Sequence, residues 1–372
     1  MADESDKYDP FAVTQVEKYM KDILILGGTG AMGKHLVSIL STRGYNVNVT
    51  SRVGHQSTAG VRYIRGNARE ESFLDSLLPR RWDAIVDFMI YRTAEFKLRA
   101  PKLLAATAQY IYLSSARVYA DSSEPIQEYF PRLLDCSDDS DFLNTDEYSL
   151  AKARQEDILS QSGRTNWTII RPYITYSNQR LQLGVFEKEG WLYRALKGRT
   201  IVFSEDIANK MTTLTYGFDV AQAITCLINE PEALGEAYHV TQREACRWSE
   251  ILGIYLDVLE RYLGARPKVL LLGLDDFSRC KPCEYQIKYD RLFNRVFDSS
   301  KIADFANVNA FLPLRERLTR CLEEFLEKPQ FSAIDWRAEA IKDRHSGEVA
   351  TLDEIGNWRR KVKYLIWRYI RS

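Results

Sequence analysis

The sequence predicts an α/β protein in which a Rossmann-like, doubly wound parallel sheet is followed by a smaller mixed α/β lobe. Short apolar runs alternate with helical patterns over residues 22–175, and a glycine turn lies between the first run and the first helix. Strands that alternate with helices are typical of a parallel sheet covered on both faces. Such a sheet needs fewer than roughly 200 residues, so a chain of 372 leaves room for a second lobe.

The first part of the chain consists of repeated strand and helix units. Residues 23–26 form an apolar run, and Leu36, Val37 and Leu40 give the next segment a helical apolar face. Gly44 ends that helix, and an alternating strand pattern follows at 45–49. Further strands are expected at 61–66, 83–89, 110–115 and 167–176. Further helices are expected at 72–78, at 93–108 with a kink at Pro101, and at 148–161.

A glycine turn directly follows the first predicted strand. Gly27, Gly30 and Gly33 are three residues apart and precede a helix, which is the context that a dinucleotide fingerprint requires. Glycine permits a tight turn, and the helix N-terminus adds positive potential that favours a pyrophosphate. A purely structural turn is the alternative. We expect a dinucleotide to contact the turn residues Gly27, Thr29, Gly30, Ala31, Met32 and Gly33.

The end of the second strand indicates which dinucleotide is bound. An acidic side chain at this place binds the ribose hydroxyls of NAD, whereas this chain has Ser51 and Arg52. A guanidinium suits a 2′-phosphate, so NADP is favoured over NAD as the cofactor. Asn67, after the third strand, is expected to meet the adenine. The alternative for Arg52 is an ordinary solvated strand end.

Tyr148 and Lys152 are the candidate catalytic pair. A Y-x-x-x-K pattern arises by chance in a chain with 21 tyrosines, so its position on a predicted helix after the strand-end Ser115 carries the argument. An ammonium beside a phenol favours the phenolate, so Tyr148 is expected to move a proton while a nicotinamide carries the hydride. Ser115 is expected to hydrogen-bond the same oxygen, unless it only caps the strand. Ser114, Lys152 and Pro172 are expected to contact the cofactor.

The segments GGTGAMG, YLSSARVYA, YSLAKARQE and TIIRPYITY resemble the NAD-dependent epimerase/dehydratase family of extended short-chain dehydrogenases. The resemblance covers roughly residues 22–325. It implies that Ser115 is the catalytic hydroxyl, that Tyr148 transfers the proton and that Lys152 holds the nicotinamide ribose. Glu156 matches the acidic residue that is common after the lysine in that family.

Departures from the family pattern bear on the substrate. Where the family often has R-P-x-N-x-Y-G, residues 171–177 lack the asparagine that helps to hold a sugar nucleotide. Ala116 and Arg117 replace the Asp-Glu of sugar-nucleotide 4,6-dehydratases, so that class is disfavoured. The fourth strand ends in DFMIY rather than in small, polar residues. Candidate contacts to a substrate phosphate are Asn178, Lys210 and Arg295.

Two functions follow from these observations. The first is an NAD(P)-dependent oxidoreductase that transfers hydride at a sugar carbon of a nucleotide sugar, as an epimerase or a keto-reductase. The second is an RNA-binding or regulatory protein that keeps the dinucleotide fold and uses a basic C-terminal helix as its contact surface. The intact set of Ser115, Tyr148 and Lys152 favours the enzyme, because a binding protein does not need it.

Bulk properties narrow the partners and the location. Lys+Arg and Asp+Glu both number 51, so the net charge favours neither nucleic acid nor an acidic membrane surface. The acidic N-terminus lacks the features of a secretory signal, and no apolar run approaches the roughly 20 residues that cross a bilayer. We expect a cytoplasmic homodimer without a nucleic-acid partner. Cys280 and Cys283 form the one C-x-x-C pair, with no second pair to complete a zinc site, so no metal is expected.

The expected domain organisation has four parts. They are an N-terminal tail at 1–21, an NAD(P)-binding domain at 22–175, a mainly substrate-binding lobe at 176–330 and a C-terminal helical extension at 331–372. A return of the chain from the second lobe to the sheet is left open. In the last helix, a stripe of Trp358, Val362, Leu365, Ile366 and Tyr369 is expected to bind the second lobe or a partner subunit, with a membrane surface as the alternative.

Overall fold

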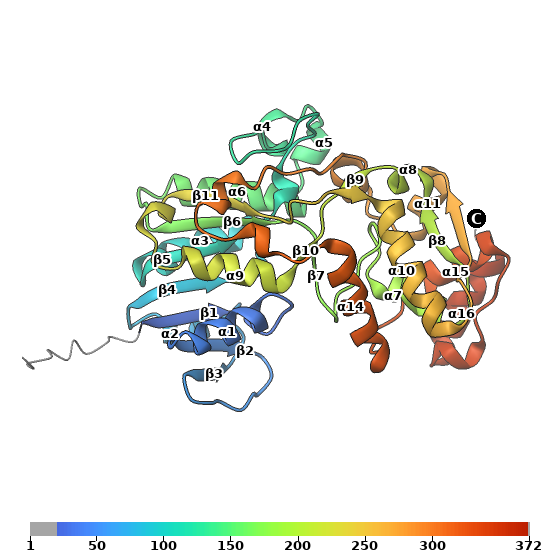
Figure 1. Ribbon diagram of the computed structural model, residues 1–372, viewed down its shortest axis with the longest axis horizontal. Coiled ribbons are helices and arrows are strands. Elements are labelled where there is room, and N and C mark those ends of the chain that lie inside the picture. The colour runs from blue at the N-terminus through green and yellow to red at the C-terminus, as the bar shows by residue number, and fades with distance from the viewer. Residues whose placement is uncertain (1–20, 371–372) are drawn as a thin grey trace, which may run out of the picture.

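Seven parallel strands form the central sheet in the computed structural model, which describes residues 21–370 (Figure 1). Their spatial order is β3-β2-β1-β4-β5-β6-β11. The strands are β1 (Asp22–Leu26), β2 (Asn46–Ser51), β3 (Val61–Arg65), β4 (Trp82–Asp87), β5 (Thr107–Leu113), β6 (Trp167–Pro172) and β11 (Glu236–Val240). The predicted fold class is therefore confirmed. The predicted N-terminal tail lies, apart from Lys21, outside the described residues.

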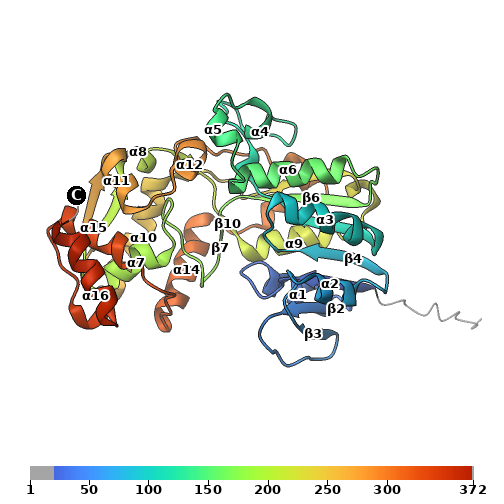
Figure 2. The same cartoon turned by 180° about the vertical axis from the view of Figure 1, so that it is seen from behind.

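Helices cover both faces of the sheet, as the continuous apolar strands require. Ile23, Leu24, Ile25 and Leu26 are all fully buried, because side chains on both faces of β1 meet helices. One face is covered by α1 (Gly33–Thr42) and α9 (Gly217–Leu227). The other is covered by α2 (Glu71–Leu77), α3 (Thr93–Ala105) and α6 (Tyr148–Ser160), as Figures 1 and 2 show from opposite sides.

Two expected elements differ from the structure in their ends. The expected strand 167–176 is interrupted, because Ile174 has a positive φ of 32° and only the two-residue β7 (Thr175–Tyr176) follows. The expected helix 93–108 ends at Ala105, since the residues after it already belong to β5. The acidic connection 120–147 follows η1 (Ala116–Val118) and contains the short helices α4 (Leu133–Cys136) and α5 (Ser140–Leu143).

The chain leaves the sheet after β6 and later returns to it. β7 pairs in parallel with β10 (Thr215–Tyr216), and α9 then leads back through η2 (Pro231–Ala233) to β11 beside β6. Gly217 opens α9 so close to the glycine turn that a Cβ there would lie 2.9 Å from the carbonyl oxygen of Ala31. This return places residues of the second half of the sequence against the turn.

The second lobe is a mixed assembly of helices and two small sheets. Strand β8 (Ile201–Ser204) pairs in parallel with β13 (Val269–Leu272), and β9 (Met211–Thr212) pairs antiparallel with β12 (Cys246–Arg247). The aromatic side chains of Trp191, Tyr255, Phe277 and Phe325 fill its core. Its helices are α7 (Lys188–Leu196), α8 (Glu205–Ala208), α10 (Trp248–Leu263), α11 (Leu274–Cys280), α12 (Glu284–Gln286), η3 (Ile287–Arg291) and α14 (Leu314–Glu327). The chain between η3 and α14 passes back by the sheet and forms α13 (Ser300–Ala303) and η4 (Val308–Ala310).

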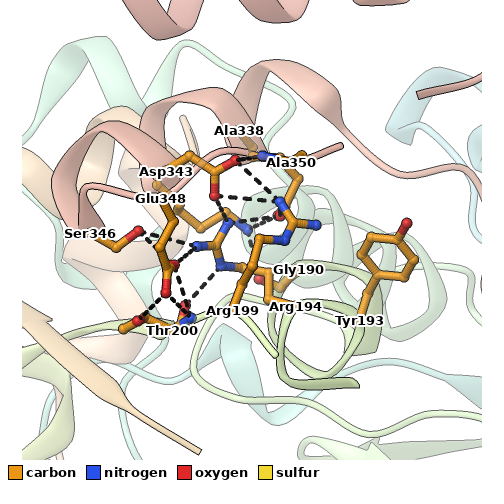
Figure 3. A network of polar contacts seen from close by, with 12 residues as sticks. Gly190, Tyr193, Arg194, Arg199, Thr200, Ala338, Asp343, Ser346, Glu348 and Ala350 are labelled. Atoms are coloured by element: carbon orange, nitrogen blue, oxygen red, sulfur yellow. Dashed lines mark hydrogen bonds and ion pairs between the residues drawn. The ribbon is translucent and has the colours of Figure 1, made fainter. Parts of the chain in front are cut away.

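A buried ion network attaches the C-terminal extension to α7 (Figure 3). Arg194 donates to Asp343 at 2.7 Å and to Glu339 at 2.9 Å, and all three side chains are almost fully buried. Arg199 lies 3.2 Å from Asp343. Burial acts to raise the pKa of Asp343, but Arg194, Tyr364 and Arg199 outweigh it and hold that pKa below its usual range. The extension comprises α15 (Trp336–Ser346), η5 (Leu352–Ile355), α16 (Trp358–Leu365) and η6 (Ile366–Ile370).

The last helix contacts the molecule through a different face from the one predicted. Tyr364 is fully buried, whereas Trp358, Val362, Leu365 and Tyr369 are exposed. The stripe does not pack on the second lobe, and the other expected partner, a second subunit, stays a prediction. The stripe faces outward because the Tyr364 hydroxyl donates to the buried Asp343 carboxylate, which orients the helix.

Neither a membrane span nor a metal cluster is found within residues 21–370. Every helix in this range is too short or too polar to cross a bilayer. No group of His, Cys, Asp and Glu side chains in the same range could hold a metal ion, and the six cysteines are free.

We predict that Arg194→Met lowers the free energy of unfolding by about 3–5 kcal/mol, because removing one partner leaves buried carboxylates uncompensated. Urea unfolding measures the loss. The control is Arg261→Met, which removes an exposed ion pair with Glu323 and should cost about 1 kcal/mol or less. The pKa of Asp343 is lowered on folding. The difference in free energy of unfolding between the wild type and Arg194→Met should therefore diminish as the pH falls below about 4. Equal losses for the two variants would contradict the prediction.

Candidate active site

The glycine turn lies where the order of the strands reverses, between β1 and β4. Gly27 has a φ of +73°, which favours glycine, and a Cβ on Gly33 would lie 2.6 Å from the backbone of Gly28. A Cβ on Gly30 would meet no atom within 4 Å. Helix α1 begins at Gly33, and its N-terminus brings positive potential to the turn, where the N–H of Lys34 donates to the carbonyl oxygen of Gly30. The crevice outside this switch point is the usual ligand site of an open α/β sheet.

The predicted adenosine contacts lie at the carboxyl ends of neighbouring strands. Ser51 ends β2, and its hydroxyl oxygen accepts a hydrogen bond from the N–H of Val53 at 3.2 Å. Arg52 follows β2 directly and is exposed. Asn67 follows β3, where its side chain accepts from the N–H of Arg69 at 3.1 Å and donates to Glu70. The contacts of these side chains with a cofactor stay predictions.

One cavity of about 430 Å³ brings together the three predicted catalytic residues and some of the predicted cofactor contacts. Its lining includes Met32 of the glycine turn, the strand-end pair Ser114 and Ser115, the candidate pair Tyr148 and Lys152, and Pro172. A second hollow of about 450 Å³ runs along Thr29, Gly30 and Ala31, and the two hollows share Arg180 and Glu187. The glycine turn and the Y-x-x-x-K pair thus open onto adjoining spaces.

Lys152 holds a buried ammonium next to Tyr148. Its Nζ donates to the carbonyl oxygen of Leu113 at 2.6 Å and lies 6.0 Å from the centre of the Tyr148 ring. Burial lowers the pKa of Lys152 to about 8, although the nearby carboxyl groups of Asp87 and Glu156 favour the charged form. The ammonium is therefore protonated at neutral pH and loses its charge a little above it.

Two buried carboxyl groups support Lys152 and were not predicted in this role. Asp87, at the end of β4, accepts hydrogen bonds from the hydroxyls of Tyr110 at 2.8 Å and Tyr91 at 3.0 Å, and burial raises its pKa. Glu156 forms a two-point ion pair with Arg171 on β6, at 2.9 and 2.8 Å. The Ser114 hydroxyl donates to Glu156 at 2.5 Å, which directs Ser114 toward this pair.

Tyr148 is the first residue of α6, and Arg117 lies beside its ring. The Arg117 guanidinium is 5.1 Å from the ring centre and forms an ion pair with Glu147 at 2.8 Å. Ser115 caps η1, because its hydroxyl oxygen accepts from the N–H of Arg117 at 3.2 Å. A hydroxyl that accepts this bond keeps its own hydrogen for donation to another oxygen. The cap and the catalytic interpretation of Ser115 are therefore compatible.

The second lobe adds cations to the cavity that sequence reasoning missed. Arg180, Lys281 and Arg291 line it together with Arg117, whereas Glu187 is the one carboxylate in this lining. Arg291 is buried, and its Nε donates to the carbonyl oxygen of Gly184 at 2.9 Å. Arg180 pairs with Glu187 and Arg291 with Asp290. Because cations outnumber carboxylates in the lining, the wall favours a negatively charged ligand.

The three candidate phosphate contacts lie outside the lining of this cavity. Asn178 accepts from Lys34 at 3.5 Å and donates to Glu324 at 3.0 Å. Arg295 is fully buried, and its guanidinium donates to Asp290 and to the main-chain oxygens of Tyr119 and Ala120. Lys210 lies before β9, where its carbonyl oxygen accepts from the N–H of Trp248. Arg295 in particular has its donors engaged within the protein.

The fold is that of the short-chain dehydrogenase type, with a glycine turn at the switch point of the sheet. The chain belongs to the NAD dependent epimerase/dehydratase family, whose model matches residues 23–241. A curated relative is the chloroplast stem-loop binding protein of 41 kDa b of Arabidopsis thaliana, which is 26% identical over 237 residues. That match spans 59% of this chain and 58% of the relative, which is less than two thirds of its length.

Solved structures share the fold at low sequence identity. The epimerase Mth375 of Methanothermobacter thermautotrophicus has a TM-score of 0.64 at 16% identity, covering 83% of this chain and 94% of its own. The Bordetella bronchiseptica enzyme WbmH in complex with NAD+ has a TM-score of 0.62 at 18% identity, covering 84% and 100%. UDP-glucuronic acid 4-epimerase of Bacillus cereus, with UDP-glucuronic acid and NAD, has a TM-score of 0.60 at 16% identity, covering 82% and 99%.

We predict that alanine at Gly33 affects stability, whereas alanine at Gly30 affects cofactor binding. Gly33→Ala forces a Cβ against the backbone of Gly28 and should destabilise the protein by about 1–3 kcal/mol in urea unfolding. Gly30→Ala meets open space and should change stability by less than about 1 kcal/mol, but its methyl group should obstruct a dinucleotide and weaken NADPH or NADH binding in a fluorescence titration. A Gly30→Ala protein with unchanged affinity for both cofactors would show that the turn does not hold a dinucleotide.

Proposed function

We propose that this protein is an NAD(P)-dependent oxidoreductase that transfers hydride at a sugar carbon of a nucleotide sugar, as an epimerase or a keto-reductase. The observation that carries the proposal is the common cavity of Ser115, Tyr148 and Lys152 beside the glycine turn. Residues from the end of β5 and from α6 meet there, although they are far apart in the sequence. Family membership supports the same chemistry.

The residues at the turn fit a nicotinamide dinucleotide. The open space at Gly30 suits a pyrophosphate, and the buried ammonium of Lys152 is placed to hold a ribose hydroxyl. Ser51 and Arg52 are proposed to hold a 2′-phosphate, which favours NADP over NAD. When bound, the nicotinamide supplies or accepts the hydride.

Tyr148 is proposed to move the proton that accompanies the hydride. The cations of Lys152 and Arg117 lie 6.0 and 5.1 Å from the centre of its ring. Ser115 donates its hydroxyl hydrogen to the substrate oxygen and so fixes that oxygen near the phenol. In the reductive direction the phenol gives its proton to the developing alkoxide, and in the oxidative direction the phenolate takes it back.

The second lobe is proposed to hold an anionic substrate. Arg180, Lys281 and Arg291 face the cavity, and guanidinium groups bind phosphate or carboxylate oxygens in a two-point geometry. The related Bacillus cereus structure holds UDP-glucuronic acid, which carries both kinds of group. A nucleotide sugar fits this chemistry, with the wall cations on its diphosphate. We expect a cytoplasmic homodimer.

An RNA-binding role is the second candidate function. It is favoured by the similarity to a protein whose name describes stem-loop binding. Binding of a stem-loop RNA by the purified protein, without turnover of any nucleotide sugar tested with NADP or NAD, would support it. Turnover that is unaffected by such an RNA would support the oxidoreductase.

We predict that Tyr148→Phe lowers kcat by at least a hundredfold and leaves cofactor affinity within about twofold, because only the proton donor is removed. Wild-type turnover is first found by incubating the protein with a panel of nucleotide sugars and NADP(H) or NAD(H), with product detection by mass spectrometry. The exposed Tyr129 supplies the control, since Tyr129→Phe should leave kcat unchanged. Lys152→Ala should weaken both turnover and cofactor binding, because the ammonium acts on the phenol and on the ribose. An unchanged kcat in Tyr148→Phe would refute the catalytic role.

The cofactor proposal predicts a selective effect of Arg52. Losing one charge-assisted phosphate contact costs about 1.5–3 kcal/mol, so Arg52→Ala should weaken NADPH roughly ten- to a hundredfold and leave NADH nearly unchanged. Arg43 is the matched control, because it is an exposed arginine at the far end of α1 from the turn. Titration of both cofactors separates the cases. Equal losses for the two cofactors, or a wild-type preference for NADH, would contradict the proposal.

A further inference from the structure

The C-terminal helix presents an apolar face to solvent. We call this face, formed by Trp358, Val362, Leu365, Tyr369 and Ile370, the C-terminal stripe. Trp358 is 68% exposed, Tyr369 61% and Ile370 77%. Most large exposed apolar residues elsewhere in the described chain are scattered singly or in pairs, whereas these five follow one helix. A continuous exposed apolar face of this kind marks an interaction surface.

Contacts on the opposite side fix the orientation of the helix. The Tyr364 hydroxyl accepts from the N–H of Ala350 at 2.7 Å and donates to Asp343. The Arg337 guanidinium lies 4.0 Å from the centre of the Trp367 ring. At 100° per residue, Trp358, Val362 and Leu365 lie about 100–160° around the helix from Tyr364. The stripe therefore cannot turn inward without breaking the buried network of Figure 3.

The charge around the stripe has one sign. Residues 355–372 contain no Asp or Glu, whereas Lys+Arg and Asp+Glu are equal over the whole chain. Arg359, Arg360 and Lys363 are exposed. The cations of this segment are Arg359, Arg360, Lys361, Lys363, Arg368 and Arg371, of which Arg371 lies outside the described residues.

We propose that the C-terminal stripe docks on the surface of a bilayer that contains anionic lipids. The helix combines an exposed apolar stripe with a basic flank, which is the pattern of a helix that lies in the membrane interface. Trp358 and Tyr369 have amphipathic rings, which are enriched at the level of the lipid headgroups. The aliphatic side chains of Val362, Leu365 and Ile370 would contact the acyl chains. The cations complement the lipid phosphates.

Other occupants fit the surface less well. A second copy of this chain, related by a two-fold axis, would bring the two sets of cations together. A nucleic acid would complement the charge and stack on Trp358 and Tyr369, but its bases offer no partner for the three aliphatic side chains. Helix α16 lies at the end of the second lobe that is remote from the sheet (Figure 1).

Vesicle co-sedimentation of the full-length protein tests the proposal and does not depend on the oxidoreductase function. The vesicles contain phosphatidylcholine alone, or phosphatidylcholine with one third phosphatidylglycerol. We expect at least tenfold stronger binding to the anionic vesicles, with the difference reduced by added salt. Trp358→Ser with Tyr369→Ser should abolish binding, and Arg359→Gln with Lys363→Gln should weaken it at least fivefold.

The control replaces a similar pair elsewhere on the surface. Lys97 and Leu98 on α3 are both exposed, so Lys97→Gln with Leu98→Ala should leave vesicle binding unchanged. Thermal unfolding confirms that each variant is folded. Absence of binding to anionic vesicles, or equal binding to both kinds, would refute the proposal. Loss of a dimer, or of binding to a stem-loop RNA, in the Trp358→Ser and Tyr369→Ser protein with vesicle binding retained would assign the stripe to that partner instead.

Discussion

The candidate site depends on keeping one buried ammonium charged, that of Lys152 on α6, where it meets the end of β5. Lys152 donates to the carbonyl oxygen of Leu113, and the carboxyl groups of Asp87 and Glu156 compensate its charge from two sides. An isolated buried charge is costly, so each of these partners needs partners of its own. Tyr110 and Tyr91 donate to Asp87, and Arg171 pairs with Glu156. These contacts link the ends of β4, β5 and β6 to α6, on which Tyr148 is the first residue.

The second half of the chain completes this arrangement from the other side. The return of the chain through α9 to β11 sets Gly217 against the turn carbonyl of Ala31 and anchors the second lobe beside the crevice. That lobe brings Arg180, Lys281 and Arg291 to the cavity. The sheet and α6 therefore contribute Ser115, Tyr148 and Lys152, and the second lobe contributes the cationic wall of the same cavity.

The sequence predicted those features of the fold that depend on neighbouring residues alone. The apolar run at Ile23 to Leu26, the glycine spacing and the helical position of Tyr148 and Lys152 are properties of neighbouring residues, and they identified the sheet and the turn. The roles of Asp87 and Arg291 depend on contacts between distant segments, for which periodicity contains no information. Arg295 shows the reverse error, because an arginine that looks available in sequence is occupied by main-chain oxygens. The pattern also did not predict which side of the last helix is buried. That side is set by the hydrogen bond from Tyr364 to the buried Asp343, and not by the longer apolar stripe.

The ion network of the extension also has a consequence for the order in which the chain is completed. Arg194 and Arg199 emerge from the ribosome well before Glu339, Asp343 and Glu348, and domains generally begin to fold as they are made. Until α15 has been made, Arg194 on α7 and Arg199 after it lack their carboxylate partners. The second lobe therefore reaches its final interior only after α15 has been made. Messages truncated before α15 should yield chains that the quality-control machinery of the cell recognises as incomplete.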